Sequence, residues 1–302
     1  GKAIVFEGDA PQGQGHETTA AQAVAHAFGI HPSDVVVTTG DTGTTPFGSG
    51  TIGARMGSYF VSAAVDAAEF LKKKIARFMV HDMALSGATE DDFDFIGGEI
   101  IYRKDTNIRQ TFRDACERNI MWPINLPEGE TAGLEHTAFF EAAMPMIAFN
   151  ADFCTVEVDP ENGQFKVLNW TSSEDVGQII NPQIVEGQMQ GAIVQGISNT
   201  LFEEFIYDEN GQQLTADFEN YKLATAADVP DMKITHAPTP CPHTPLGTRG
   251  IGEGRPSDVP GTISNAVCDA LAPFRIEITE LPLRPNMIWR KIQEAKAKQA
   301  AN

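Results

Sequence analysis

Three glycine-rich segments constrain this chain most, because each stands just before apolar residues at helical spacing. They are Gly8–Gly15, Gly40–Gly57 and Gly247–Gly254. Glycine adopts backbone conformations that other residues avoid, and it lets the backbone approach a ligand closely. A helix N-terminus adds backbone N–H groups that lack a partner within the helix and attract anions. Each segment is therefore a candidate binding loop, although an ordinary turn is the simpler interpretation of the first.

The elements around these loops predict a mixed α+β fold. Apolar alternation and β-branched runs predict strands at 3–7, 34–39, 231–237 and 276–280, and hairpins at 93–102, 155–167 and 205–214. Helical spacing predicts helices beginning near residues 18 and 58, and others at 106–118, 185–197, 263–271 and 287–297, with residues 298–302 fraying. Residues 122–135 are rich in Pro, Gly and Glu and predict an exposed linker. We therefore place a boundary near it, between domains 1–130 and 131–302.

Composition limits the classes of function. The chain has 302 residues, with 41 acidic and 22 basic side chains and a net charge of −19. This charge argues against nucleic-acid binding, which needs a basic surface. The four cysteines are isolated, so we expect neither a zinc site nor an Fe–S cluster in this chain, and reduced thiols favour a cytoplasmic location. The seven histidines show no metal-ligand spacing.

Targeting segments are not predicted. No apolar run approaches the length of about 18 residues that a membrane-spanning helix needs. The first residues resemble a strand rather than a signal peptide. Because residue 1 is not Met, we expect a processed chain or the C-terminal part of a longer protein.

The third glycine-rich segment holds one carboxylate, Glu253, directly before a predicted buried helix. Loops that rigid elements hold in place are common locations for catalytic side chains. A solvated glutamate in a turn is an equally good interpretation of the loop by itself. The segment lacks the Gly-Lys-Ser/Thr ending of a phosphate-binding loop.

Several motifs resemble the molybdenum hydroxylases, the xanthine dehydrogenase and aldehyde oxidase family. Gly252-Glu253-Gly254, followed by Ile263–Val267, is similar to the family's last motif, whose glutamate is the catalytic base. Gln12–Thr18 resembles its Gly-Gln-Gly motif, most closely in the branch with aerobic carbon monoxide dehydrogenase. The resemblance implies that Gln14, with Gly15, lies near the metal's oxo ligand and the cofactor.

The second segment and two later motifs extend the resemblance. In the family, the residues that match Gly53-Ala54-Arg55-Met56 hold the pterin and its diphosphate. Many relatives have Ser at the positions of Ala54 and Met56, so only backbone contacts are implied there, and Arg55 could instead be a surface residue. Gln188 matches a pterin contact, and Asp175 and Val176 match the place where the nucleotide tail binds. Gly191 and Gly196 are expected to serve helix packing.

The resemblance implies a molybdenum cofactor, with the metal held by the dithiolene of molybdopterin, in the cytosine dinucleotide form, and by no protein side chain. It covers only the C-terminal half of a usual catalytic subunit. It therefore implies partner chains that carry the N-terminal half of that subunit, the 2Fe-2S clusters and FAD. A subunit split as in nicotinate dehydrogenase and a cleaved subunit would look the same.

The implied activity is hydroxylation of an electron-poor carbon, in an aldehyde, an N-heterocycle or a related small molecule, with oxygen from water. Glu253 would accept the proton as general base, and the electrons would pass to the Fe–S and flavin subunits. Three alternatives remain open: a carbon monoxide-oxidising member, a non-catalytic structural subunit, and an unrelated nucleotide-binding module.

Overall fold

The computed structural model describes residues 1–302 except 46, 143–145 and 302. The chain forms two compact units. Unit 1 comprises Gly1–Met146, Gly177–Asn181 and Pro240–Gly250, and unit 2 comprises Ile147–Val176, Pro182–Thr239 and Ile251–Asn302. The boundary predicted near residue 130, between domains 1–130 and 131–302, stays a prediction.

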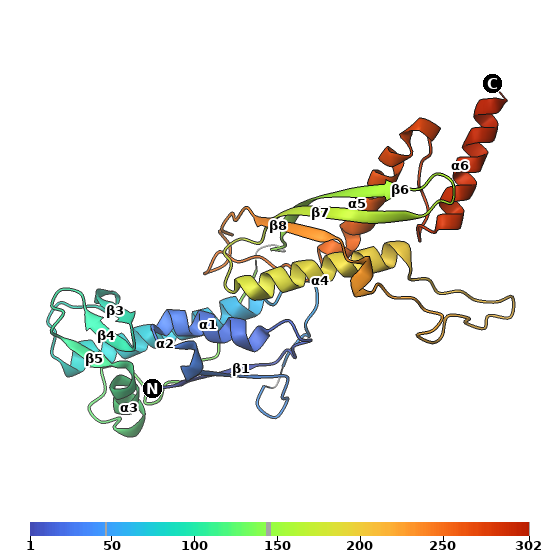
Figure 1. The fold of residues 1–302 in the computed structure, drawn as a ribbon. Helices are drawn as coiled ribbons and strands as arrows, with labels where there is room; N and C mark the ends of the chain where they lie inside the picture. The colour runs from blue at the N-terminus through green and yellow to red at the C-terminus, as the bar shows by residue number, and fades with distance from the viewer. Residues whose placement is uncertain (46, 143–145, 302) are drawn as a thin grey trace. The chain divides into compact units, whose positions relative to one another are not determined.

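Unit 1 begins with two parallel strands, β1 (Ala3–Glu7) and β2 (Val35–Thr39), joined through helix α1 (His16–Phe28). The long helix α2 (Tyr59–Asp82) packs against α1 (Figure 1). Both helices contribute buried alanines to the hydrophobic core of unit 1. The strand at 34–39 is confirmed, but it is only half-buried, because Val36 lies on the exposed face of the two strands.

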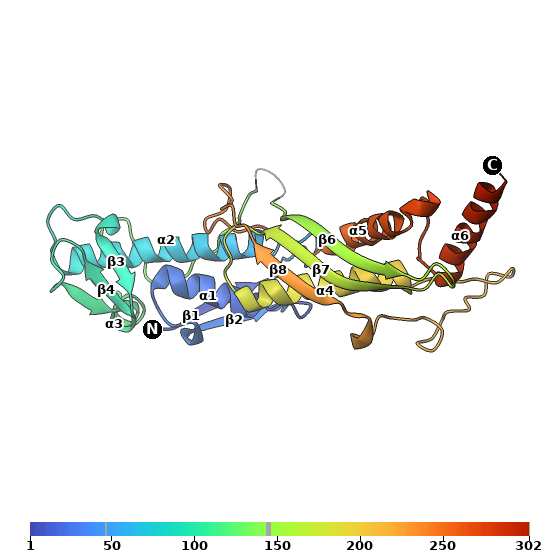
Figure 2. The same cartoon turned by 45° about the horizontal axis from the view of Figure 1, so that its top comes forward.

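The far end of α2 carries a small antiparallel sheet and a short helix (Figure 2). Its strands are β3 (Phe93–Ile96), β4 (Glu99–Tyr102) and β5 (Arg109–Thr111), followed by α3 (Phe112–Met121). The hairpin through Gly97 and Gly98 is confirmed, and both glycines have positive φ. The helix predicted at 106–118 begins only at Phe112, because residues 109–111 pair with β4 and Thr111 caps the helix.

Unit 2 is a sheet of three strands with helices on one face (Figure 1). Strands β6 (Phe149–Val158) and β7 (Phe165–Asp175) form the predicted hairpin, and β8 (Asp231–His236) runs parallel to β7. Helices α4 (Pro182–Leu201) and α5 (Arg255–Ala270) pack on each other, and α5 also packs on β6. Helix α6 (Pro285–Ala300) completes the core. The four 3₁₀ turns of the described chain are Pro32–Asp34, Glu90–Asp92, Ala226–Asp228 and Ala272–Phe274.

Several local predictions in unit 2 were wrong. Residues 276–280 form no strand, although Ile276 is buried and Ile278 packs on the core, so their apolar pattern serves packing only. The hairpin predicted at 205–214 is confirmed only at its turn, where Tyr207 bridges Gln213 and the Leu214 amide donates to the Ile206 carbonyl, and no regular strands extend from it. Helix α6 continues to Ala300, so residues 298–300 do not fray.

The glycines of α4 differ in what they face. A Cβ at Gly196 would lie 2.4 Å from the side chain of Val259, so this glycine permits close packing of α4 on α5, as predicted. A Cβ at Gly191 would meet nothing within 4 Å, so its predicted packing role is wrong for the part of the chain that the structure describes. Among those same residues, no helix combines the length and apolar character needed to cross a membrane.

Candidate functional site

Glu253 lies immediately before α5, as the sequence predicted, but the helix begins earlier than expected. Gly254 is its N-cap residue, Arg255 is its first residue, and the Gly254 carbonyl accepts a hydrogen bond of 2.8 Å from Ser257 Oγ. The Glu253 side chain is exposed. Within the described residues no hydrogen bond or ion pair engages its carboxylate, so it is available to accept a proton.

The glycines of this segment serve different ends. Gly247 has a φ of +72°, which only glycine adopts readily. A Cβ at Gly250 would lie 1.6 Å from the carbonyl oxygen of Ala54, so the two backbones touch inside unit 1. Gly254 has an ordinary helical conformation. The close approach at Gly250 therefore lies inside unit 1, whereas a Cβ at Gly254 would lie 3.8 Å from Asn150 Oδ1, an ordinary contact distance.

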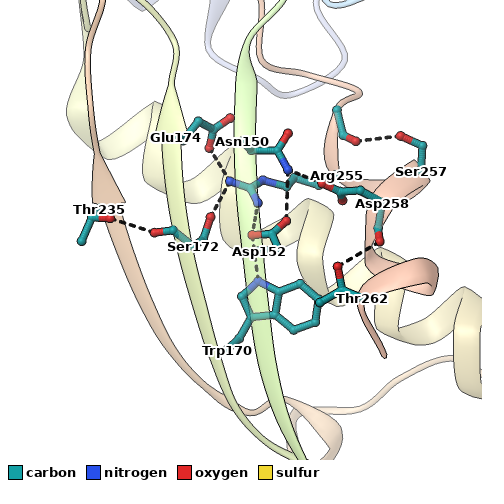
Figure 3. Close-up of polar contacts among 11 residues, drawn as sticks. Asn150, Asp152, Trp170, Ser172, Glu174, Thr235, Arg255, Ser257, Asp258 and Thr262 are labelled. Atoms are coloured by element: carbon teal, nitrogen blue, oxygen red, sulfur yellow. Dashed lines mark hydrogen bonds and ion pairs between the residues drawn. The ribbon is translucent and has the colours of Figure 1, made fainter. Parts of the chain in front are cut away.

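A buried arginine follows this loop (Figure 3). The Arg255 side chain is 1% exposed and forms ion pairs with Asp152 of β6 and, at 2.8 Å, Glu174 of β7. It also donates a hydrogen bond of 2.6 Å to Ser172 Oγ. Trp170 Nε1 donates to the same oxygen of Asp152 that Arg255 contacts. The first turn of α5 is thus fixed to two strands by charge-assisted bonds.

Burial of this cluster affects its acids. Burial raises the pKa of Glu174, and the nearby Arg255 guanidinium opposes that shift. Burial also raises the pKa of Asp258, helped by the neighbouring Asp152 carboxylate and opposed by the hydrogen bond that Asn150 donates to Asp258. Asp152, Glu174 and Asp258 thus face one arginine, so a proton on Asp258 relieves the repulsion among them.

Asp258→Asn is expected to stabilise the chain at pH 7. Because folding raises the pKa of Asp258, stability contributed by this group is present below its ordinary pKa of 3.8 and is lost as the pH rises through the folded value. Asparagine resembles the protonated form at every pH. Thermal unfolding should therefore show a higher melting temperature for the variant at pH 7 and a vanishing difference near pH 4.

The matched control is Glu157→Gln, which removes one negative charge from an exposed position of β6. A gain of equal size in the control would attribute the effect to net charge. A difference for Asp258→Asn that does not change with pH would contradict the role given to burial.

Sequence reasoning missed Arg255, Asp152 and Glu174. The signal was present in α5, where Arg255 shares one buried stripe with Val259, Ile263 and Val267 at a spacing of four residues. Asp152 and Glu174 likewise occupy inward positions of alternating strands. A charge at a core position needs a buried partner of opposite sign, and the chain offers two.

In unit 1 the first two glycine-rich loops meet. A Cβ at Gly8 would lie 2.0 Å from the carbonyl oxygen of Phe47, which shows how closely the backbones approach. Asp9 Oδ1 accepts a hydrogen bond from the Gly50 amide, and Arg55 Nη2 lies 3.4 Å from Asp9 Oδ2. Arg55 also donates a 2.6 Å bond to Ser49 Oγ. Arg55 therefore ties the loops together while its side chain stays 24% exposed.

The start of α1 has unused hydrogen-bonding groups. Gly15 is the N-cap residue, with a φ of +72°, and no side-chain hydrogen bond caps the helix. Gln14 is half-buried, and its Oε1 accepts a bond of 2.5 Å from the Gln12 amide. Nδ1 of buried His16 has no partner among the described residues. These features suit a polar ligand that accepts from N–H groups.

The other predicted contact residues are divided between the two units. Gly53 and Ala54 both have positive φ, and the Met56 side chain is buried in the unit 1 core. In unit 2, Asp175 Oδ1 accepts a 2.9 Å bond from the Thr239 amide, and Val176 is buried. Gln188 is half-buried on α4. Gln14, Gly15 and Gly53–Met56 thus belong to unit 1, and Asp175, Val176, Gln188 and Glu253 to unit 2.

Comparison with known proteins decides the family. Residues 1–230 match the family described as molybdopterin cofactor-binding domain. The chain belongs to this molybdopterin cofactor-binding family. The resemblance to xanthine dehydrogenases and their relatives is therefore confirmed, as is the mixed α+β fold.

Relatives of this family member cover nearly all of it. It is 34% identical to the nicotine 6-hydroxylase large subunit of Paenarthrobacter nicotinovorans over 293 residues. The matched region covers 96% of this chain and 35% of that protein. It is 31% identical to the carbon monoxide dehydrogenase large chain of Hydrogenophaga pseudoflava, over 97% of this chain and 36% of that one. The molybdopterin-binding chain thus spans about a third of the length of these relatives.

A solved structure gives the same relation. The crystal structure of quinoline 2-oxidoreductase from Pseudomonas putida 86 matches this family member with a TM-score of 0.91 and 34% identity, over 97% of this chain and 37% of that one. The fold of both units therefore has a counterpart in an experimentally determined oxidoreductase.

Proposed function

We propose that this chain is the C-terminal, molybdopterin-binding part of the catalytic subunit of a molybdenum hydroxylase, with Glu253 as its general base. The observation that carries the proposal is the Glu253 carboxylate, exposed and unengaged among the described residues, in a loop that directly precedes a firmly anchored helix. When bound, the molybdenum cofactor supplies the redox chemistry and the oxygen that is transferred to the substrate. Glu253 accepts a proton at its carboxylate during that transfer.

The remaining residues bind and orient the cofactor. The N–H groups at the start of α1 and the Gln14 amide suit its polar atoms, and the uncapped N-terminus of α1 supports this fit. Backbone groups of Gly53–Met56 contact the pterin and its diphosphate, helped by the charge of Arg55. Gln188 contacts the pterin, and Asp175 and Val176 lie at the nucleotide tail, in the cytosine dinucleotide form.

The complex that we propose is cytoplasmic and includes three further parts. These are the rest of the molybdenum subunit, which is about two thirds of its length in the relatives, an Fe–S subunit and a FAD subunit. Relatives named for nicotine and quinoline, both N-heterocycles, favour an N-heterocyclic substrate, and a relative named for carbon monoxide keeps that gas as an alternative. Screening the assembled complex with N-heterocycles, aldehydes and carbon monoxide tests this choice. Activity toward carbon monoxide alone would overturn the proposal of an N-heterocyclic substrate.

The isolated chain is expected to hold no molybdenum, because it supplies only part of the cofactor site. Its β1–β2 sheet also exposes Ile4, Phe6 and Val36 by 62%, 54% and 49%, which is an apolar surface suited to a protein partner. Metal analysis of the chain purified alone, with the assembled complex as control, checks this. Stoichiometric molybdenum in the isolated chain would contradict it.

Arg55→Ala is expected to lower molybdenum occupancy of the complex without unfolding the chain, because it removes the positive charge near the diphosphate. Asp9→Asn is the matched control: it weakens the tie between Arg55 and the first loop and keeps the cation. Occupancy should fall clearly further in Arg55→Ala than in the control. Equal losses in both variants would mean that Arg55 acts only by holding the loops. An unchanged occupancy in Arg55→Ala would favour the alternative that Arg55 is a surface residue without a ligand.

A further inference from the structure

Only Gly254 separates Glu253 from Arg255, whose buried side chain has several charged and polar partners. Arg255 contacts Asp152 on β6, and Glu174 and Ser172 on β7 (Figure 3). Its Cα therefore has a fixed place relative to two paired strands. Glu253 itself has no such contact within the described residues, so its own side chain does not fix the loop.

The glycines on both sides of Glu253 make such an anchor necessary. Glycine leaves the backbone more freedom than any other residue, so Gly252-Glu253-Gly254 has little conformational preference of its own. The Gly254 carbonyl accepts from Ser257 Oγ, and the Gly254 Cα faces Asn150, whose amide also bonds Asp258 in the first turn of α5. The loop is thus held on its α5 side by the first turn of the helix, and before Ile251 by the 2.8 Å bond that the Gly250 amide donates to the Met146 carbonyl.

We propose that Arg255, held by Asp152 and Glu174, is a positioning residue that sets where the Glu253 carboxylate lies. The proposal rests on the proposed role of Glu253 as base. Arginine suits this task because its planar fork binds two carboxylates at once, whereas lysine has a single charged point on a flexible stem. A purely structural ion pair, which serves only to stabilise unit 2, is the competing explanation.

The test uses Arg255→Lys in the molybdenum-loaded complex, because lysine keeps the charge and loses the fork. Misplacing a catalytic group by about 1 Å can slow a reaction up to a hundredfold. We expect the limiting rate of molybdenum reduction by substrate to fall roughly tenfold or more, with the substrate dissociation constant and molybdenum content unchanged. Amide hydrogen exchange of residues 251–254 should become faster, a readout that needs no activity.

A double-mutant cycle separates positioning from stability. If Arg255 acts through Glu253, then Arg255→Lys should cause no further loss of rate in a Glu253→Gln background. The stability control is Ile263→Ala, a buried position on α5 far along the helix from the loop, which should destabilise the chain without changing exchange at 251–254. If Arg255→Lys fails to fold, Glu174→Gln loosens the same arginine while keeping its pair with Asp152.

Equal rate losses from Arg255→Lys in both backgrounds would overturn the proposal, as would unchanged exchange at residues 251–254. An equal change of exchange in Ile263→Ala would also overturn it, because the effect would then follow stability alone. Failure of the proposed function would give a different result. If Glu253→Gln alone keeps the parent rate, then Glu253 is not the base, whatever exchange shows for the loop.

Discussion

Glu253→Gln is expected to slow the reduction of molybdenum by substrate about a hundred- to ten-thousandfold, the usual effect of removing a general base. Glutamine keeps the shape of the side chain and removes the proton acceptor. Fold, molybdenum content and substrate affinity should survive, because Glu253 is exposed and its carboxylate forms no hydrogen bond or ion pair with the other described residues. Rapid mixing with substrate, followed at the molybdenum centre, measures the effect.

Reoxidation through the Fe–S clusters is the internal control for this variant, since it needs no proton acceptor at residue 253 and should change little. Glu277→Gln is a matched control outside the loop, since Glu277 is another exposed glutamate of unit 2. If the Glu253→Gln complex, with full molybdenum occupancy, is reduced as fast as the parent, then Glu253 is only a loop residue.

Arg255→Met should lower the free energy of unfolding by about 3–5 kcal/mol, the usual consequence of removing one partner of a buried ion pair. Methionine fills much of the same space but leaves Asp152 and Glu174 buried without a cation. Denaturant unfolding of the chain at pH 7 measures the loss. The loss should shrink at low pH, where Glu174, whose pKa is raised by burial, takes up a proton.

A charge-free version of the cluster is the control for this prediction. Combining Arg255→Met with Asp152→Asn and Glu174→Gln removes every charge of the two ion pairs, so neither Asp152 nor Glu174 is left as a buried anion without its cation. This triple variant should recover much of the loss, because neutral replacement of a buried ion pair is often nearly free of cost. A triple variant as unstable as Arg255→Met would show that packing of the guanidinium, and not its charge, stabilises unit 2.

Local signals were sufficient to predict elements whose sequence pattern and packing agree. Strand β1, the hairpin at Gly97-Gly98 and the β6–β7 hairpin were found, because alternation and turn residues act within a few positions. The segment at 276–280 has the same kind of pattern but forms no strand. Its isoleucines pack on the helical core without pairing, and only tertiary structure decides between the two.

The site was only partly predictable for the same reason. The place of Glu253 follows from its loop and helix, which are neighbours in sequence. The partners of Arg255 lie 103 and 81 residues away on separate strands, and the tie between Asp9 and Arg55 spans 46 residues. Such pairings depend on how strands and loops are brought together, and single-sequence patterns do not encode this directly.

The central claim, that this chain forms part of a molybdenum active site, is tested most directly by metal analysis of the complex that contains it. Purified from its native host with its partner chains, the complex should contain stoichiometric molybdenum per copy of this chain, and substrate should reduce that metal. An intact complex that holds the chain but lacks molybdenum would contradict the account, and would favour a structural subunit or a nucleotide-binding module instead.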